Sequence, residues 1–430
     1  MFDNQGLPVT AESAPALAAF RDAMTDWLDY RLTAMPKLKD ALERDPGFCL
    51  AHCLRGYMLM MYNSRKFHGA ARSALESARA AQEGVSARER MHLAALAHWL
   101  EGDPQHACSQ WEAILIAHPL DILALRLHHF VSFWMGRSHQ LIAVPASVHP
   151  AWGREVANYG NVLGMMAFGL EEIGQYREAE RFGREAVACN PGDLWAIHSV
   201  AHVLESQRRH KDGLAWLDFP LDQWDDRNPF RGHLWWHRGL YLMEAKQLDD
   251  ALALYDRAIY DTRSDFYLDI QNAAAYLARL EFLGLAVGDR WQALADHAAA
   301  AKGDHVLVFT DMHNVISLAR AGRFAEAHDF IASMQAAAKG ETHVAHVLRR
   351  VGIAIAQALL AFEEGDYATA ADAMLLSRPS LIEVGASHAQ RDLVSLYAIE
   401  AARRSGKRAL LDHLTQEREF MSRIGRADIA

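Results

Sequence analysis

Two stretches decide the fold of this chain: PGDLWAIHSVAHVLE at residues 191–205 and FRGHLWWHRGLYLME at residues 230–244. Each carries two histidines four residues apart, namely His198 and His202 in the first and His233 and His237 in the second. On an α-helix this spacing puts both members of a pair on one face. The two pairs are offset by 35 residues, which is close to the roughly 34-residue period of a helix–turn–helix repeat. Equivalent positions of neighbouring repeats stack side by side, so we expect four imidazoles on one wall.

A short motif recurs where second helices are expected to begin. A glycine or polar residue is followed by an aromatic residue or leucine, and an alanine comes three residues later, in segments 174–179, 246–251, 322–327 and 365–370. The small alanine lets paired helices approach closely, and the pattern resembles tetratricopeptide repeats. No strand-like alternation and no interdomain linker appears. The sequence therefore predicts an all-α, tetratricopeptide-like helical-repeat solenoid of about twenty helices, able to close on itself and forming one domain over residues 1–430. Thr10 is expected to cap a first helix over 11–34.

Composition excludes several classes of function. The net charge is −10 without a basic cluster, which argues against a nucleic-acid partner. No run of 18 apolar residues occurs, so we expect no membrane span. The start of the chain lacks the pattern of a signal peptide, and the four cysteines form no disulfide-rich pattern. We therefore expect a cytoplasmic protein.

Several segments resemble those of the tetratricopeptide repeat protein 38-like family, in the expected order along the chain. They are DPGFCLAH (45–52), AFGLEEIGQYREAE (167–180), HSVAHVLE (198–205), HLWWHRGLYLME (233–244), DMHN (311–314) and GASHAQRD (385–392). The resemblance implies a helical-repeat fold and supplies no reaction. The family pattern usually has two glycines before the serine of the last motif. Ala386 takes the second place here, a change that we do not expect to matter.

The histidine pairs form the first candidate site. Trp195, His198, His202 and Glu205 make one stripe on a helix, and His233 and His237 lie beside Trp236 on the next repeat. Imidazoles with a carboxylate nearby suit a divalent transition metal such as zinc, with the four histidines as ligands. His202 and His237 could instead act as general acid and base. The alternative without chemistry is that these histidines pack against tryptophans and bond backbone carbonyls.

Two further motifs are candidates. Asp311 and His313 either serve as a helix cap with a histidine in the first turn or reach the groove as a base or ligand. His388, Arg391 and Asp392 occupy one helical turn. They either form an internal salt bridge that locks the last repeats, or Arg391 binds a carboxylate or phosphate of a ligand. A serine nucleophile at Ser387 is not expected, because adjacency to His388 is no evidence for a triad.

Two classes of function follow from these candidates. The first is a small-molecule-binding protein, a hydrolase or lyase that uses histidine acid–base chemistry or a histidine-bound metal. The second is a scaffold that holds a peptide or partner protein in its concave groove, as Lys-, Arg- and Asn-lined grooves do. This wall carries histidines and aromatic residues, which favours the first class. The amphipathic C-terminal helix expected over 407–424 could pair two copies of the chain.

Overall fold

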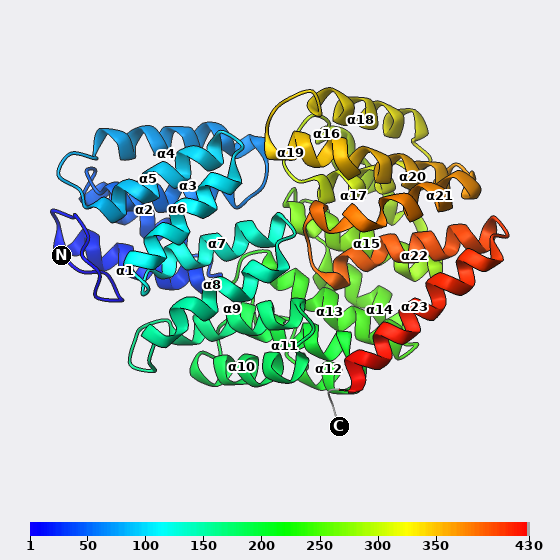
Figure 1. Cartoon of the computed structure of the whole chain (residues 1–430), viewed down its shortest axis with the longest axis horizontal. Helices are drawn as coiled ribbons and strands as arrows, with labels where there is room; N and C mark the ends of the chain where they lie inside the picture. The colour runs from blue at the N-terminus through cyan, green and yellow to red at the C-terminus, as the bar shows by residue number, and fades with distance from the viewer. Residues whose placement is uncertain (428–430) are drawn as a thin grey trace. The chain divides into compact units, whose positions relative to one another are not determined.

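The computed structural model describes residues 1–427, and over this range the chain is helical without a single strand (Figure 1). Only isolated backbone bridges occur, between Phe2 and Pro8 and between Arg31 and Arg227. The prediction of an all-α helical-repeat fold is confirmed.

The helices follow one another with short connections. In the first half of the chain they are α1 (Ala14–Leu28), α2 (Ala34–Arg44), α3 (Cys49–Met60), α4 (His68–Ala80), α5 (Ala87–Leu100), α6 (Pro104–Ala117), α7 (Ile122–Trp134), α8 (Ser138–Val148), α9 (Tyr159–Glu172), α10 (Tyr176–Cys189) and α11 (Leu194–Ser206). The second half holds α12 (His210–Trp216), α13 (Phe230–Glu244), α14 (Leu248–Leu254), α15 (Tyr267–Phe282), α16 (Trp291–Ala300), α17 (Val308–Arg320), α18 (Phe324–Ala337), α19 (His343–Val347), α20 (Ile353–Glu363), α21 (Tyr367–Ser377), α22 (His388–Arg404) and α23 (Arg408–Ala427). Short 3-10 turns occur at Arg65–Phe67, His149–Ala151, Gly288–Arg290 and Arg378–Val384, and single π-helical turns at Tyr255–Ile259 and Leu348–Gly352.

One turn geometry closes hairpin after hairpin. A residue with positive φ ends the first helix, and the next residue donates its backbone N–H to the carbonyl five residues back, which is the Schellman motif. The donors are Arg31, Asp103, Arg137, Gln175, Arg209, Gln247, Leu285, Arg323, Asp366 and Lys407. The left-handed residue is usually glycine, as at Gly174 and Gly322, and is Lys246 in one repeat. The "glycine or polar residue" of the sequence motif is therefore the left-handed stop of the first helix.

The recurring alanine of the motif is the packing residue of the second helix. Ala179, Ala251, Ala327 and Ala370 are all fully buried. Helix α10 packs on α9 through Ala179, Gly183 and Ala186, and a Cβ atom on Gly183 would come 2.6 Å from Val200. Such small side chains allow the close helix approach that the sequence predicts.

The chain forms two compact units. Unit 1 comprises Met1–Phe133, Arg137–Val200 and Asp222–Phe230, and unit 2 comprises Trp134–Gly136, Ala201–Leu221 and the chain from Arg231 onward. The boundary passes through the continuous helix α11. The single domain over 1–430 stays a prediction.

The first helix begins later in the chain than the sequence predicts. Ser13, and not Thr10, caps the first helix, because its side chain accepts from the N–H of Ala16, while Thr10 donates to Glu89. The helix expected over 11–34 is α1, which is shorter at both ends and spans Ala14–Leu28. The segment His343–Glu363, which runs through α19, a π-helical turn and α20, is long and apolar enough to cross a membrane, yet 56% of that window is buried in the structure. A core helix passes the same test.

Candidate metal centre

Helix α11 carries the first histidine pair. Asp193 caps this helix by accepting from the backbone N–H groups of Trp195 at 2.9 Å and Ala196 at 3.2 Å. Side-chain caps of this kind fix where a helix begins and hence its register. The register places His198, His202 and Glu205 along one face, as the sequence predicts.

Helix α13 carries the second pair. It begins where Asn228 accepts the N–H of Phe230 at 2.9 Å. His233 and His237 lie one turn apart, and their ring centroids are 4.9 Å from each other. The ring of His237 is 4.4 Å from that of His202, so α13 faces α11 through its histidines.

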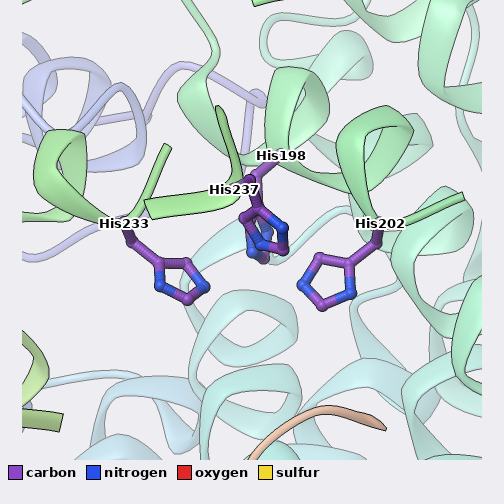
Figure 2. A group of neighbouring side chains, drawn as sticks. All are labelled: His198, His202, His233 and His237. Carbon is purple, nitrogen blue, oxygen red and sulfur yellow. The ribbon is translucent and has the colours of Figure 1, made fainter. Parts of the chain in front are cut away.

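The four histidines form one buried cluster. One ligating nitrogen from each of His198, His202, His233 and His237 can be chosen so that all four lie within 4.8 Å of one another. Figure 2 shows the imidazoles of His233 and His202 on either side of the overlapping rings of His198 and His237. None of the four is more than 3% exposed. The predicted convergence of the two pairs is therefore confirmed.

Aromatic side chains surround the imidazoles. His233 stacks on Trp236 at 5.1 Å with an interplanar angle of 13°. His198 stacks on Phe168 at 5.5 Å and contacts Trp195 at 5.0 Å. Trp195 also lies under the guanidinium of Arg126, at 4.8 Å. The packing of histidines on tryptophans, which the sequence leaves open as an alternative, is thus present together with the cluster.

Burial keeps the imidazoles of His202, His233 and His237 neutral. Loss of hydration lowers the pKa of His233 to about 4 and holds the pKa values of His202 and His237 well below their ordinary value, with neighbouring imidazoles adding repulsion. A neutral imidazole has a lone pair available for a metal. At neutral pH these side chains are therefore in the ligand form without losing a proton.

Hydrogen bonds fix which nitrogen of His233 faces the cluster. Its Nδ1 lies 2.8 Å from Oδ1 of Asn272 on α15. Because an amide oxygen only accepts, Nδ1 carries the hydrogen and Nε2 carries the lone pair. Metal-ligating histidines are oriented in this way by partners of their other nitrogen. Glu205 lies near His237, with Oε2 3.7 Å from Nδ1, which is beyond hydrogen-bond distance.

Arg279 on α15 contacts both the histidine-bearing helix α13 and the motif GASHAQRD (385–392). Its guanidinium lies 5.4 Å from the ring of Trp236 and donates to the carbonyl of Ala389 at 2.7 Å. Its charge lowers the pKa of both His237 and His313, for each of which burial is the larger cause. A buried arginine within the largely apolar run AAAYLARLEF (273–282) is a signal that could have been found in the sequence and was missed, as was Asn272.

Asp311 and His313 have separate partners. His313 donates from Nδ1 to the carbonyl of Phe309 at 2.7 Å, and its Nε2 has no hydrogen-bond partner among the described residues. Oδ1 of Asp311 lies 3.0 Å from Nδ1 of His305, whose Nε2 lies 2.7 Å from the hydroxyl of Ser333. Of the two alternatives that the sequence leaves open for Asp311, the helix cap is wrong, since Asp311 lies inside α17 and pairs with His305 of the preceding loop. His305 was not predicted, because only the loop conformation brings it to Asp311.

Three residues of the last motif, GASHAQRD (385–392), make contacts within the protein. Asp392 forms a two-pronged ion pair with Arg418 of α23; although burial would raise its pKa, Arg418 holds that pKa below the ordinary value. This is the internal lock that the sequence offers as one alternative, made with Arg418 in place of a neighbour in the motif. Arg391 donates to the carbonyls of Gly385 and Ala386. Ser387 caps α22 in a capping box with Gln390.

The backbone at Ala386 has a left-handed conformation, which the sequence does not predict. Its φ is 68°, in the left-handed region that disfavours a side chain. Gly385 has φ 79° and ψ −154°, a conformation open essentially to glycine alone. The replacement of the second glycine of the family pattern by alanine therefore has a conformational cost, contrary to what we expect from the sequence.

Comparison with known proteins gives distant similarities only. No protein-family model matches the chain. Among solved structures, human IFIT1, in a dimer with m7Gppp-AAAA, is 12% identical with a TM-score of 0.44, and the match covers 87% of each chain. The tetratricopeptide domain of P58(IPK) is 12% identical with a TM-score of 0.22, over 80% of this chain and 88% of the other. These likenesses concern no more than the helical-repeat fold, which the hairpins themselves define.

Proposed function

We propose that this protein binds a divalent transition metal through His198, His202, His233 and His237 and presents it to a small organic ligand. The observation that carries this proposal is the gathering of four buried ligand atoms within 4.8 Å of one another. Imidazole ligands suit zinc, copper, iron and nickel. We propose zinc among these because it takes four ligands in a tetrahedral arrangement, which four histidines can supply.

The dimensions of the cluster support this assignment. A zinc–nitrogen bond of about 2.1 Å puts neighbouring ligands of a tetrahedral ion about 3.4 Å apart. The four ligand atoms, which lie within 4.8 Å of one another, would have to move closer together when the ion binds. Asn272 and Glu205 would then orient His233 and His237 as partners outside the ligand set.

The proposed reaction class is a metal-assisted hydrolysis or elimination. Catalytic zinc sites have three protein ligands and an open position. His202, His233 and His237 are linked by direct ring contacts. We assign these three as permanent ligands on the strength of those contacts, and the fourth position, which His198 can reach, as the one that a substrate or water takes. His313, with its unpartnered Nε2, is the candidate acid or base.

Membership of the tetratricopeptide repeat protein 38-like family is part of the proposal. Four of the resembling segments contribute to one neighbourhood in the structure: the two histidine helices, His313, and the segment around Ala389 that Arg279 contacts. Convergence of separate motifs on one site is the expected outcome when a site, and not only packing, accounts for them.

The test is metal stoichiometry and affinity. Wild-type protein stripped with a chelator should take up one zinc per chain, and cobalt in its place should give the visible absorption of a low-symmetry nitrogen site. The shape-preserving double variant His202→Gln/His237→Gln should lose at least a hundredfold in zinc affinity while keeping its helical circular dichroism. His328→Gln, an exposed histidine paired with Glu364, is the matched control. Equal affinity in the double variant and the wild type would overturn the proposal.

A further inference from the structure

Unit 1 contains a buried arginine that has no acidic partner. Arg126 of α7 is 5% exposed, and among the described residues neither an ion pair nor a hydrogen bond joins its guanidinium to a carboxylate. Its Nη2 donates to the hydroxyl of Tyr30, and its Nη1 is buried without a hydrogen-bond partner in the described part of the chain. A donor that loses its water without gaining an acceptor is costly, and more so when it carries a charge. An acceptor supplied by a ligand would remove this cost.

A second donor without a partner lies beside the first. The indole of Trp195 is 9% exposed, and its Nε1 is buried without a hydrogen-bond partner among the residues described. The guanidinium of Arg126 lies 4.8 Å from the centre of this indole ring. Guanidinium and indole N–H groups only donate. The group that would complement both is therefore an acceptor, and the charge of the arginine favours a negatively charged one.

Asp193 does not neutralise Arg126. Oδ1 of Asp193 accepts two backbone N–H groups at the start of α11, and Oδ2 accepts the side-chain amide of Asn161 at 3.0 Å. Burial and repulsion from Asp29 raise the pKa of Asp193 to about 7, although the charge of Arg126 acts in the opposite direction. At neutral pH Asp193 is thus partly protonated, and it leaves the positive charge of Arg126 incompletely balanced.

The two donors lie next to the proposed metal centre. The indole ring of Trp195 lies 5.0 Å from the ring of His198, which follows it by about one turn on α11. His198 can reach the fourth ligand position, which we assign to a substrate or water. Arg126, Trp195 and His198 all belong to unit 1. An anionic group held by Arg126 would therefore lie close to that position.

We propose that Arg126, with the indole N–H of Trp195, binds the carboxylate of a small organic acid. Two donors suit the two oxygens of a carboxylate, and a single guanidinium suits a single negative charge, since a second one would be buried without a partner. The inference rests on the proposed function in one respect: the acid would be the substrate of the metal centre. Binding of the carboxylate does not itself require the metal.

The direct test uses benzoate as the probe in calorimetric titrations of the zinc-free full chain. Its planar ring suits the aromatic side chains around Arg126. Benzoate should bind at least about tenfold more tightly than benzamide, which has the same shape and no charge, because hydrogen bonds between charged groups are the stronger ones. Equal binding of the two, or no binding of benzoate, would overturn the proposal. Tighter binding of phenylphosphonate than of benzoate would overturn the assignment of a carboxylate.

The tryptophan variant localises the binding at little risk to the fold. Trp195→Phe keeps an aromatic ring and removes the donor, so it should weaken benzoate by about three- to tenfold. Trp152→Phe is the matched control, because it also removes the N–H of a buried tryptophan, one that donates to the carbonyl of Pro119. Equal affinities in the two variants would remove Trp195 from the site.

The arginine variant tests the charge. Arg126→Gln should weaken benzoate at least about tenfold and leave the weak binding of benzamide unchanged. Arg154→Gln, at an exposed arginine of unit 1 paired with Glu185, should bind benzoate as the wild type does. Circular dichroism checks the fold of each variant, and if Arg126→Gln does not fold, Trp195→Phe decides. Unchanged benzoate affinity in a folded Arg126→Gln would overturn the site.

Titrations with and without zinc separate the two proposals. If benzoate binds and zinc does not, the metal centre fails and the carboxylate site stands. If zinc binds stoichiometrically and benzoate does not, the inference drawn here alone fails. If both bind, zinc should tighten benzoate about fivefold or more, and benzoate should tighten zinc by the same factor, because the coupling is reciprocal. Independent binding of the two would overturn the role of the acid as a substrate of the metal centre.

Discussion

Oε2 of Glu205 lies 3.7 Å from Nδ1 of His237, a fully buried member of the histidine cluster, while the Glu205 side chain itself is 25% exposed. Burial, with repulsion from Asp392, raises the pKa of Glu205 to about 8. At neutral pH the side chain is therefore largely protonated in the free protein. A cation bound at the histidines would favour the carboxylate form, which accepts the Nδ1–H of a histidine whose Nε2 binds the metal.

Glu205→Gln should weaken zinc binding by about ten- to a hundredfold, because the neutral amide is a poorer acceptor for Nδ1–H. Competition with a chromophoric chelator measures the affinity. Glu341→Gln, at an exposed position, should leave it unchanged. An unaltered affinity in Glu205→Gln would remove Glu205 from the centre.

Asn272 offers an independent test of how His233 is oriented. Asn272→Leu removes the acceptor of Nδ1–H and should weaken zinc binding about tenfold or more. Asn272→Asp restores an acceptor and should recover most of the affinity. A similar loss in both variants would indicate that the position only packs.

The turn before α22 makes a prediction about stability. Ala386→Gly should raise the free energy of unfolding by about 0.5–1 kcal/mol, because relief of the left-handed alanine exceeds the entropy that glycine adds to the unfolded chain. Gly385→Ala should lower it by at least about 2 kcal/mol, since a Cβ atom there would lie 2.4 Å from the carbonyl oxygen of Trp134. Denaturant titrations compare the three proteins, and a stabilising Gly385→Ala would contradict the assigned backbone.

Asp311 was a candidate catalytic residue, and its contact with His305 predicts a different role. Asp311→Asn should cost about 1–3 kcal/mol of stability, because it weakens a buried tie between the loop before α17 and Ser333 on α18. Zinc affinity should not change. A loss of zinc affinity at unchanged stability would return Asp311 to the site.

Asp193 provides a pH test in unit 1. Burial, with repulsion from Asp29, raises its pKa to about 7. Between pH 4 and 7 the folded state therefore holds a proton that the unfolded state has released, so this group's contribution to stability falls as pH rises through that window and is constant above it. Asp193→Asn removes the titrating group while keeping an acceptor for the cap of α11. The difference between wild type and variant should change by on the order of 1 kcal/mol per pH unit, and a flat difference would contradict the raised pKa.

Much of this molecule could be predicted from its sequence because it is built from local repeats. The left-handed stops, the buried alanines and the histidine pairs are spaced within one or two helices, where helical periodicity determines which side chains share a face. Residues such as Asn272 and Arg279 could not be assigned in this way. They reach the histidines from α15, and only the packing of separate hairpins decides which of its many buried side chains face them. His305 depends on a loop conformation with positive φ, which periodicity does not predict.

The burial of all four imidazoles has a consequence for the lifetime of a bound ion. Because none of them is more than 3% exposed, an ion could enter or leave only when helices around the cluster move apart. Local opening of these helices would then be the rate-limiting step of ion release. In an excess of chelator, the rate of ion loss would therefore not depend on the chelator concentration.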